Sequence, residues 1–232
     1  MNRATWIVKG GVNLRAWFGS RRYSEDLDLD AVGSAPHVLR ERFDKILLGR
    51  PLGDFLTSQG LELARISKPK QTDTTQRWKL ELKAAGTSVP LYTKVEFSRR
   101  AGHDDDYVLE PARSDIVRPY GIPAPTVNHY TARSAVRQKI HALASRSETQ
   151  ARDVWDLDHL LRSTDADPRP LSDRLREALP VATERVMSLE HDVFKSQVVP
   201  YLSDDDQATY GTRDAWDRMR ELVVERLEEF GS

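Results

Sequence analysis

The chain has 232 residues, of which 39% are hydrophobic and none is cysteine, so it can bury its own core, and disulfides and thiolate metal sites are excluded. No apolar run approaches the roughly 18 residues of a membrane span, and no signal peptide begins the chain, so we expect a cytoplasmic protein without a membrane partner. The net charge of −1 hides an asymmetry, with net +7 over residues 1–100 (18 Lys and Arg, 11 Asp and Glu) and net −8 over residues 151–232 (11 against 19).

The first hundred residues predict an α/β domain. Residues 5–9 form a short apolar run that stops at Gly10-Gly11, and residues 12–18 then show helical spacing, which indicates a strand, a tight turn and a helix. Residues 24–32 alternate between acidic and apolar side chains, as in a strand with two unlike faces. Further helices are predicted at 36–48 and 51–58, and further strands at 61–66, 77–83 and 91–99.

Residues 101–126 contain four prolines and an acidic run, which predict a linker. We therefore expect one domain over residues 1–125 and an all-helical domain over residues 126–232. Helical spacing is present at 132–145, 151–161, 171–188 (with Pro180 starting a new segment), 190–199 and 213–230. The last of these carries an apolar stripe that indicates core or a docking surface rather than a cofactor site, formed by Trp216, Met219, Val223, Leu227 and Phe230.

The acidic strand is the feature that most needs a chemical explanation, because carboxylates are costly in the middle of a strand. Asp26 and Asp28 share a face and could bracket a pair of Mg²⁺ ions, with Mn²⁺ as the alternative metal. Glu96, between two apolar residues in the predicted strand 91–99, is the natural third ligand. Asp30 lies past the pair and should matter less. The competing interpretation is an edge strand with one solvated acidic face.

Two further features have weaker signals. The Gly10-Gly11 turn opens a helix, where backbone N–H groups favour a phosphate, although two glycines are more often only a tight turn. Lys139 lies at the edge of an apolar helix face, and Asp153 and Asp156 begin the next predicted helix, so a cation and two acids could converge there. A solvated charge pattern explains Lys139 and these acids equally well.

Five motifs together resemble the AbiEii/MenT family of bacterial nucleotidyltransferase toxins. They are LysGlyGlyValAsnLeuArg at 9–15, ArgTyrSerGluAspLeuAspLeuAsp at 22–30, LysValGluPhe at 94–97, LysIleHisAlaLeuAlaSerArg at 139–146 and ArgAspValTrpAspLeu at 152–157. Their order and spacing over residues 9–161 carry the resemblance, which no single motif would.

The resemblance implies a polymerase-beta-like nucleotidyltransferase domain joined to a helical domain that contributes Lys139 and Asp153. It implies a toxin whose partners are an NTP, an antitoxin protein and RNA, with a nucleotide, often a pyrimidine, added to the 3′ acceptor end of tRNA so that aminoacylation and growth stop. By matching position, Ser24, Asp26 and Asp28 form the metal motif, and Asp153 is the acid of the Arg-Asp motif. Nucleotide binding falls to Lys9, Gly10, Gly11, Ser24 and Lys139.

The expected reaction is in-line attack of an acceptor hydroxyl on the α-phosphorus of an NTP, with Asp26, Asp28 and Glu96 as the catalytic metal ligands and Glu96 also as proton acceptor. Lys139 and Arg15 or Arg22 would neutralise developing charge. RNA is favoured as acceptor by the charge of the first hundred residues, where these cations gather: Arg15, Arg21, Arg22, Lys68, Lys70, Arg77, Lys79, Arg99 and Arg100. A small aminoglycoside-like hydroxyl compound, a protein side chain, and a non-catalytic RNA- or antitoxin-binding module are the alternatives.

Ser24 is a candidate regulatory position. It lies two residues before Asp26, so strand alternation would put its hydroxyl on the metal-facing side, near the phosphates of the NTP. Phosphorylation there would add about −1.5 to −2 charges and repel the nucleotide. The plain alternative is that Ser24 only ends a turn.

Overall fold

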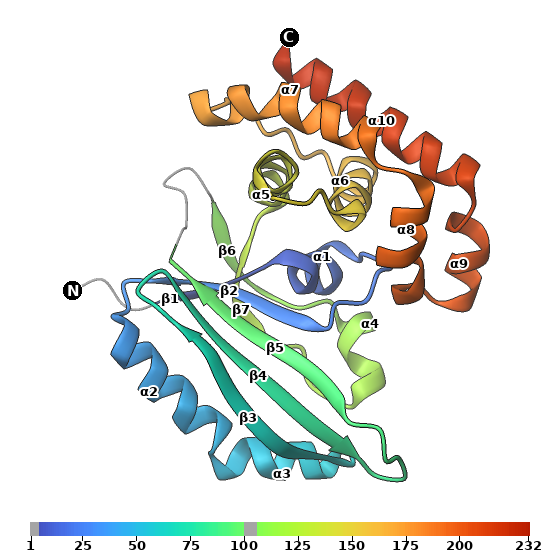
Figure 1. The fold of residues 1–232 in the computed structure, drawn as a ribbon. Coiled ribbons are helices and arrows are strands. Elements are labelled where there is room, and N and C mark those ends of the chain that lie inside the picture. The colour runs from blue at the N-terminus through green and yellow to red at the C-terminus, as the bar shows by residue number, and fades with distance from the viewer. Residues whose placement is uncertain (1–4, 100–105) are drawn as a thin grey trace. The chain divides into compact units, whose positions relative to one another are not determined.

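The computed structural model describes residues 5–99 and 106–232, and in these residues it shows a mixed seven-stranded sheet and ten α-helices (Figure 1). The strands are β1 (Thr5–Lys9), β2 (Asp26–Val32), β3 (Leu61–Gln71), β4 (Thr75–Ala84), β5 (Leu91–Ser98), β6 (Tyr107–Pro111) and β7 (Thr126–Tyr130). The helices are α1 (Gly10–Phe18), α2 (Pro36–Leu47), α3 (Arg50–Ser58), α4 (Ser114–Val117), α5 (Ala132–Ser145), α6 (Ala151–Ser163), α7 (Asp173–Ser188), α8 (His191–Gln197), α9 (Asp204–Tyr210) and α10 (Arg213–Gly231). None of the described helices is long and apolar enough to cross a membrane.

The sheet has the strand order β3-β4-β5-β2-β1-β7-β6. β2 lies antiparallel to β1 and parallel to β5, while β3, β4 and β5 form an antiparallel meander. The acidic strand β2 is therefore an inner strand with a neighbour on each side. This confirms the predicted α/β class, and it excludes the alternative that the acids lie on an edge strand.

One face of the sheet is apolar and is packed by α2. Phe43 of α2 lies edge-on against Trp78 of β4 and Phe97 of β5, with ring centroids 4.8 and 5.1 Å apart, and Trp6 of β1 lies 5.1 Å from Phe97. Trp78 and Phe97 are fully buried, and such edge-to-face pairs are favourable beyond their buried area. Because side chains alternate along a strand, the residues between these aromatics point to the opposite, polar face of the sheet.

The chain forms two compact units. The described residues of the first are 5–12, 25–99 and 109–129, and those of the second are 13–24, 106–108 and 130–232. Most of α1 therefore belongs to the helical unit, where its Leu14 is buried in the core. The division into functional domains at residues 1–125 and 126–232 stays a prediction.

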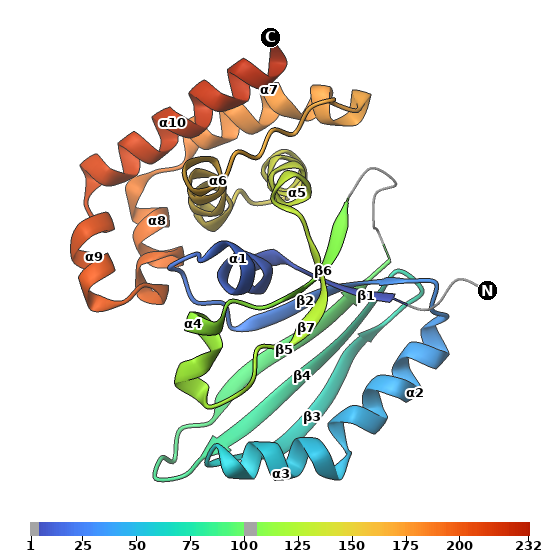
Figure 2. The same cartoon turned by 180° about the vertical axis from the view of Figure 1, so that it is seen from behind.

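The predicted linker at 101–126 is wrong for most of its described residues. Residues 107–111 form β6, Ser114–Val117 form α4, and Thr126–Tyr130 form β7 next to β1 (Figure 2). Pro111 and Pro125 flank the pairing of β6 with β7, where the N–H of Ala112 donates to the carbonyl of Pro125. A proline at the end of a strand removes no ladder hydrogen bond. These two prolines therefore lie at the ends of the paired strands and do not indicate an unstructured segment.

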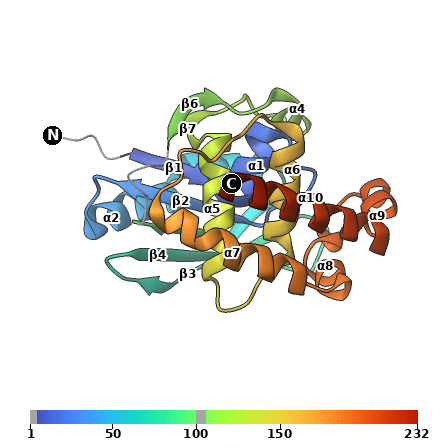
Figure 3. The ribbon, with the colours of Figure 1, turned by 90° about the horizontal axis from the view of Figure 1, so that it is seen from above.

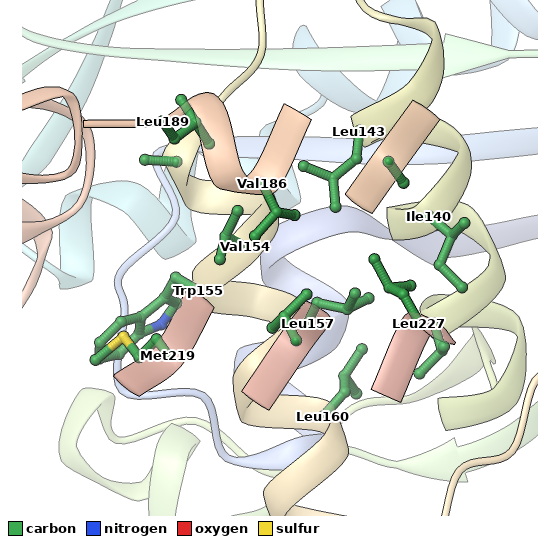
Figure 4. Packing of buried hydrophobic residues seen from close by; sticks show 14 of the residues in the cluster. Ile140, Leu143, Val154, Trp155, Leu157, Leu160, Val186, Leu189, Met219 and Leu227 are labelled. Carbon is green, nitrogen blue, oxygen red and sulfur yellow. The ribbon is translucent and has the colours of Figure 1, made fainter. Parts of the chain in front are cut away.

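The helical unit has its own apolar core. α7 and α10 lie side by side and contact α5 and α6 (Figures 1 and 3). Figure 4 shows Leu143 of α5, Leu157 of α6, Val186 of α7 and Leu227 of α10 meeting in this core. The predicted stripe of α10 is buried along its whole length, which confirms it as core. α9, which comes between α8 and α10, was not predicted because its seven residues are mostly polar and lack an apolar period.

Pro180 does not start a new segment, since α7 runs from Asp173 to Ser188 with the proline inside it. Ala178 and Leu179 before the proline and Ala182 and Val186 after it are all buried, so packing holds the helix together across the break in its hydrogen bonds. Proline costs about 3 kcal/mol relative to alanine inside a helix, and Pro180 is exposed.

Pro180→Ala is therefore expected to increase the free energy of unfolding by about 1–3 kcal/mol, because it restores a backbone donor and removes a steric clash. Urea unfolding followed by circular dichroism measures this change. A variant that is less stable than the wild type would show that Pro180 does not destabilise α7.

Candidate active site

The carboxylates of the acidic strand belong to a row of charged residues across the polar face of the sheet. Asp28 of β2 is directly opposite Glu96 of β5 and also opposite Lys9 of β1, and Glu96 is opposite Arg77 of β4. Directly opposed residues on neighbouring strands present their side chains on the same face. The sheet therefore brings Asp28 and Glu96 together, as the sequence predicted.

Each outer carboxylate of the predicted metal triad is held by a cation. Lys94 Nζ lies 2.9 Å from Asp26 Oδ2, and Arg77 Nη2 lies 2.6 Å from Glu96 Oε2. Asp28 lies between these pairs, and burial raises its pKa against the opposing effects of Lys94 and Lys9. A further positive charge beside Asp28 would therefore favour its ionised form.

Gly10 lies against the same carboxylate. Its φ of +67° is in the left-handed region, and a Cβ placed there would come within 3.1 Å of Asp28 Oδ2. A side chain at this position would therefore be strained and would occupy the space beside the acid. Gly10 is also the first residue of α1, with Gly11 following it, so the N-terminal backbone groups of a helix begin beside Asp28.

Asp30 is held by a structural ion pair and is not part of the metal triad. Lys9 Nζ donates to Asp30 Oδ1 at 2.6 Å and to Ser98 Oγ at 2.6 Å, and the Ser98 hydroxyl donates to the same carboxylate. Asp30 is 3% exposed, so the Lys9 ammonium compensates a buried charge. Lys9, predicted to bind nucleotide, uses two of its three donors in this cluster.

The triad suits a divalent cation by donor type and register. Carboxylate oxygens are the ligands that Mg²⁺ and Mn²⁺ prefer, and Lys94 and Arg77 now neutralise charges that a metal ion would neutralise. Within residues 5–99 and 106–232 no three His, Cys, Asp or Glu side chains are already gathered so that they could hold a metal ion. A metal ion bound by the triad would take the place of Lys94 beside Asp26 and of Arg77 beside Glu96.

The helical unit contains a second charged cluster, formed by residues of α5, α6 and the segment before β2. Lys139 Nζ lies 2.8 Å from Asp153 Oδ1 and 2.5 Å from Asp156 Oδ2. Arg146 Nε donates to Asp153 at 2.7 Å, and Arg22 makes a two-pronged contact with Asp156 at 3.1–3.2 Å. The structure therefore brings together the lysine and the two acids that the sequence singled out.

Most of this cluster is buried, since neither aspartate is exposed and Arg22 is 7% exposed, whereas the side chain of Arg146 is 40% exposed. Burial alone would lower the pKa of Lys139, but the carboxylates of Asp153 and Asp156 outweigh it and raise this pKa. Burial would raise the pKa of Asp156, but Lys139 and Arg22 hold it below its ordinary value. With three cations and two acids, the charged cluster keeps an excess positive charge.

Ser24 lies outside the strand in which it was predicted, because β2 begins at Asp26. Strand alternation therefore does not place the Ser24 hydroxyl on the metal-facing side, and Ser24 belongs to the same compact unit as Arg22. The sequence also gave no sign that Lys94 and Arg77 hold the triad acids. The charges of Lys94 and Arg77 are visible in the sequence, but their partners depend on which strands are neighbours and on the register of β2, β4 and β5.

The sequence matches a known protein family. The family described as "Nucleotidyl transferase AbiEii toxin, Type IV TA system" matches residues 2–229. No curated protein sequence matches the chain.

Two solved structures from Helicobacter pylori share the fold. JHP933 superposes with a TM-score of 0.57 at 18% identity, covering 97% of this chain and 86% of that one. A proposed nucleotidyltransferase superposes with a TM-score of 0.58 at 19% identity, covering 97% and 89%. The family match over nearly the whole sequence, together with the paired acids on the sheet, shows that the chain belongs to the AbiEii family of nucleotidyltransferase toxins of type IV toxin–antitoxin systems.

Proposed function

We propose that this toxin transfers a nucleoside monophosphate from an NTP, in a Mg²⁺-dependent reaction, to the 3′ acceptor end of tRNA, and so blocks aminoacylation and growth. The observation that supports this most strongly is the direct pairing of Asp28 with Glu96 on inner strands, beside the glycine at which α1 begins. Carboxylates on inner strands cost stability, so two of them directly opposite each other favour a functional role such as metal binding.

Asp26, Asp28 and Glu96 would hold the metal ions, with Mn²⁺ able to replace Mg²⁺. Bound there, the metal would supply charge neutralisation of the phosphates and a lower pKa of the acceptor hydroxyl. The hydroxyl oxygen forms a bond to the α-phosphorus as the bond from that phosphorus to the β-phosphate bridging oxygen breaks, and pyrophosphate leaves. Glu96 accepts the hydroxyl proton in this scheme.

The remaining predicted residues would act on the phosphates of the NTP. Gly10 and Gly11 offer backbone N–H groups at the start of α1, where an anion is favoured. Lys139 has a third donor beyond its two aspartates and belongs to a cluster with excess positive charge. Asp153 would position Lys139 in this role. Arg22, also in that charged cluster, is four residues before Asp26 in the chain.

Polynucleotide is the acceptor class that the charge of the first hundred residues supports, because contacts to phosphate dominate affinity for nucleic acids. The other partner is the antitoxin that a toxin of this family implies.

The test is to incubate the purified toxin with each α-labelled NTP in turn, with Mg²⁺ or with EDTA, and with total RNA, purified tRNA or an aminoglycoside as acceptor. We expect label in tRNA only, only with the metal, and with one NTP preferred. Label in the aminoglycoside or in the protein, with none in RNA, would replace this function by one of its alternatives.

Ser24 gives a prediction on regulation of the same activity. If its hydroxyl contacts the triphosphate, Ser24→Ala removes a hydrogen bond to a charged group and slows transfer by about 10–100-fold. Ser24→Glu adds a negative charge and should slow transfer at least as much, as a phosphate at this position would. Initial rates at equal folded concentration measure both, with Ser58→Ala and Ser58→Glu on exposed α3 as controls. Full activity of Ser24→Glu would rule out the regulatory role.

A further inference from the structure

A groove on the polar face of the sheet begins at the metal triad and is not used by the proposed chemistry. It has a volume of about 550 Å³, within the usual range of ligand sites. Asp26 lines one end of this β-face groove, whereas Asp28 and Gly10 do not line it. The other lining residues come from β3, β4, β5 and the residue before β2, namely Glu25, Arg65, Ser67, Lys79, Leu80, Glu81, Tyr92, Thr93 and Lys94.

The groove is built from two rows of residues that the strand register fixes. The first row crosses four strands, from Asp26 through Lys94 and Lys79 to Ser67. In the second row Tyr92, Glu81 and Arg65 are opposite one another on β5, β4 and β3. Because hydrogen-bonded strands hold these rows in place, the groove is preformed by the sheet and does not depend on the position of a loop.

The first row contains two like charges directly opposite each other, Lys79 and Lys94. Such pairs destabilise a sheet. Lys94 has Asp26 as its partner, while Lys79 makes no ion pair among the described residues, and neither does Arg65 of the second row. Lys79 is exposed, so a phosphate placed beside the two lysines would offset their repulsion.

Four other cations that the sequence assigned to RNA already have an acidic partner. Arg21 pairs with Asp206, Arg22 with Asp156, Lys68 with Asp44 and Arg77 with Glu96. Arg100 lies outside the described residues. The groove is lined by three cations, Arg65, Lys79 and Lys94, and by the acids Glu25, Asp26 and Glu81. Arg65 and Lys79, which make no ion pair among the described residues, are able to bind a phosphate.

Tyr92 adds an aromatic surface at the same place. Its side chain is 67% exposed at the start of β5, and it lines the groove together with Lys79 and Lys94. Basic side chains beside an exposed ring are the combination that binds single-stranded nucleic acids, since phosphates take the charges and a base stacks on the ring.

The groove and Gly10 lie on opposite sides of the triad, and this separates the expected position of the RNA from that of the NTP. In-line transfer places the attacking oxygen and the leaving pyrophosphate on opposite sides of the α-phosphorus. Gly10, the proposed phosphate position, follows β1 on one side of β2, and the groove extends over β5, β4 and β3 on the other. The leaving group thus belongs on the β1 side and the acceptor on the groove side.

We propose that the β-face groove binds the single-stranded 3′ end of the RNA acceptor, with Lys79 and Lys94 on its phosphates and a base stacked on Tyr92. This rests on the proposed function and assigns its acceptor site. The negative charge of Glu81 repels a polyanion and lowers its affinity for the groove. Removal of this charge should therefore strengthen RNA binding, which can be measured.

Binding is measured first without chemistry, by fluorescence anisotropy of a labelled ten-nucleotide single-stranded RNA in EDTA. Lys79→Glu and Tyr92→Ala should each weaken binding about tenfold, and Lys79→Glu should also reduce the slope of log affinity against log salt by roughly 0.7. Glu81→Gln should tighten binding. Lys83→Glu, on the same face of β4 but outside the groove, and Tyr120→Ala, exposed elsewhere on the same unit, should stay within about twofold of wild type.

Transfer assays then identify the substrate in the groove. Lys79→Glu and Tyr92→Ala should raise the KM for RNA about tenfold and leave the KM for NTP unchanged. Variants that alter the KM for NTP instead, or Lys79→Glu that weakens RNA binding no more than Lys83→Glu, would overturn the assignment. Wild-type toxin that transfers nothing to RNA would instead refute the proposed function, and the binding assay in EDTA would still decide whether the groove holds RNA.

Discussion

Replacing Asp28 by asparagine is expected to lower nucleotide transfer by about 1,000-fold or more and to leave the fold intact. The substitution keeps the shape of the side chain and removes the charge between the Lys94–Asp26 and Arg77–Glu96 pairs. Electrostatic groups aimed at the reacting phosphates commonly contribute this much to catalysis.

The stability of the same variant should move in the opposite direction. Burial raises the pKa of Asp28, so the folded protein holds this proton more tightly than the unfolded chain, and keeping Asp28 ionised near pH 7 costs stability. Asp28→Asn should therefore be at least as stable as the wild type in urea. Asp54→Asn, on exposed α3, is the matched control and should change neither property. An Asp28→Asn enzyme with near wild-type rates would remove the basis of the metal assignment.

The second large effect is expected at Asp156, whose loss should reduce the free energy of unfolding by about 3–5 kcal/mol. Asp156 is fully buried and compensates both Lys139 and Arg22, and removing one partner of such a cluster leaves uncompensated buried charge. Asp217→Ala removes a partly exposed partner of Arg220 and should cost no more than about 1 kcal/mol. Equal losses of unfolding free energy in the two variants would show that burial does not increase the contribution of the charged cluster to stability.

The pH dependence of this contribution has a definite sign. Although burial would raise the pKa of Asp156, Lys139 and Arg22 hold it below its ordinary value in the folded state, so the stabilisation is present above about pH 4 and is lost as the pH falls through the folded-state pKa. The difference in unfolding free energy between wild type and Asp156→Ala should be constant from pH 7 to pH 5 and smaller at pH 3. A difference that grows on acidification would contradict the ionised state of the buried acid.

The paired acids could be predicted from the sequence because alternation within a strand is a local property. Asp26 and Asp28 share a face whatever the fold around them, and a further acid flanked by apolar residues, Glu96, stands out in the same way. The apolar stripe of α10 is local in the same sense. Helix and strand positions followed from these periods, while Pro180 misled because packing on either side of it outweighed its intrinsic cost.

The charge partners could not be predicted, since they depend on contacts between distant segments. Nothing near Asp30 in the sequence shows that Lys9 neutralises it and that Ser98 donates a hydrogen bond to it, and nothing near Lys79 shows that it faces Lys94. The order of strands β3-β4-β5-β2-β1 creates both contacts. The strand β6 was missed for a related reason, because a short strand between prolines is stabilised by the partner it pairs with.

The measurement that tests the central claim most directly is the mass of purified tRNA after incubation with the toxin, NTP and Mg²⁺, taken together with the pyrophosphate released. Successful transfer should increase the tRNA mass by whole nucleoside monophosphates, with one pyrophosphate released for each, and both changes should be absent with Asp28→Asn. Consumption of NTP with no gain in tRNA mass, or the same gain with Asp28→Asn, would contradict the assignment of the β2 and β5 carboxylates to nucleotide transfer.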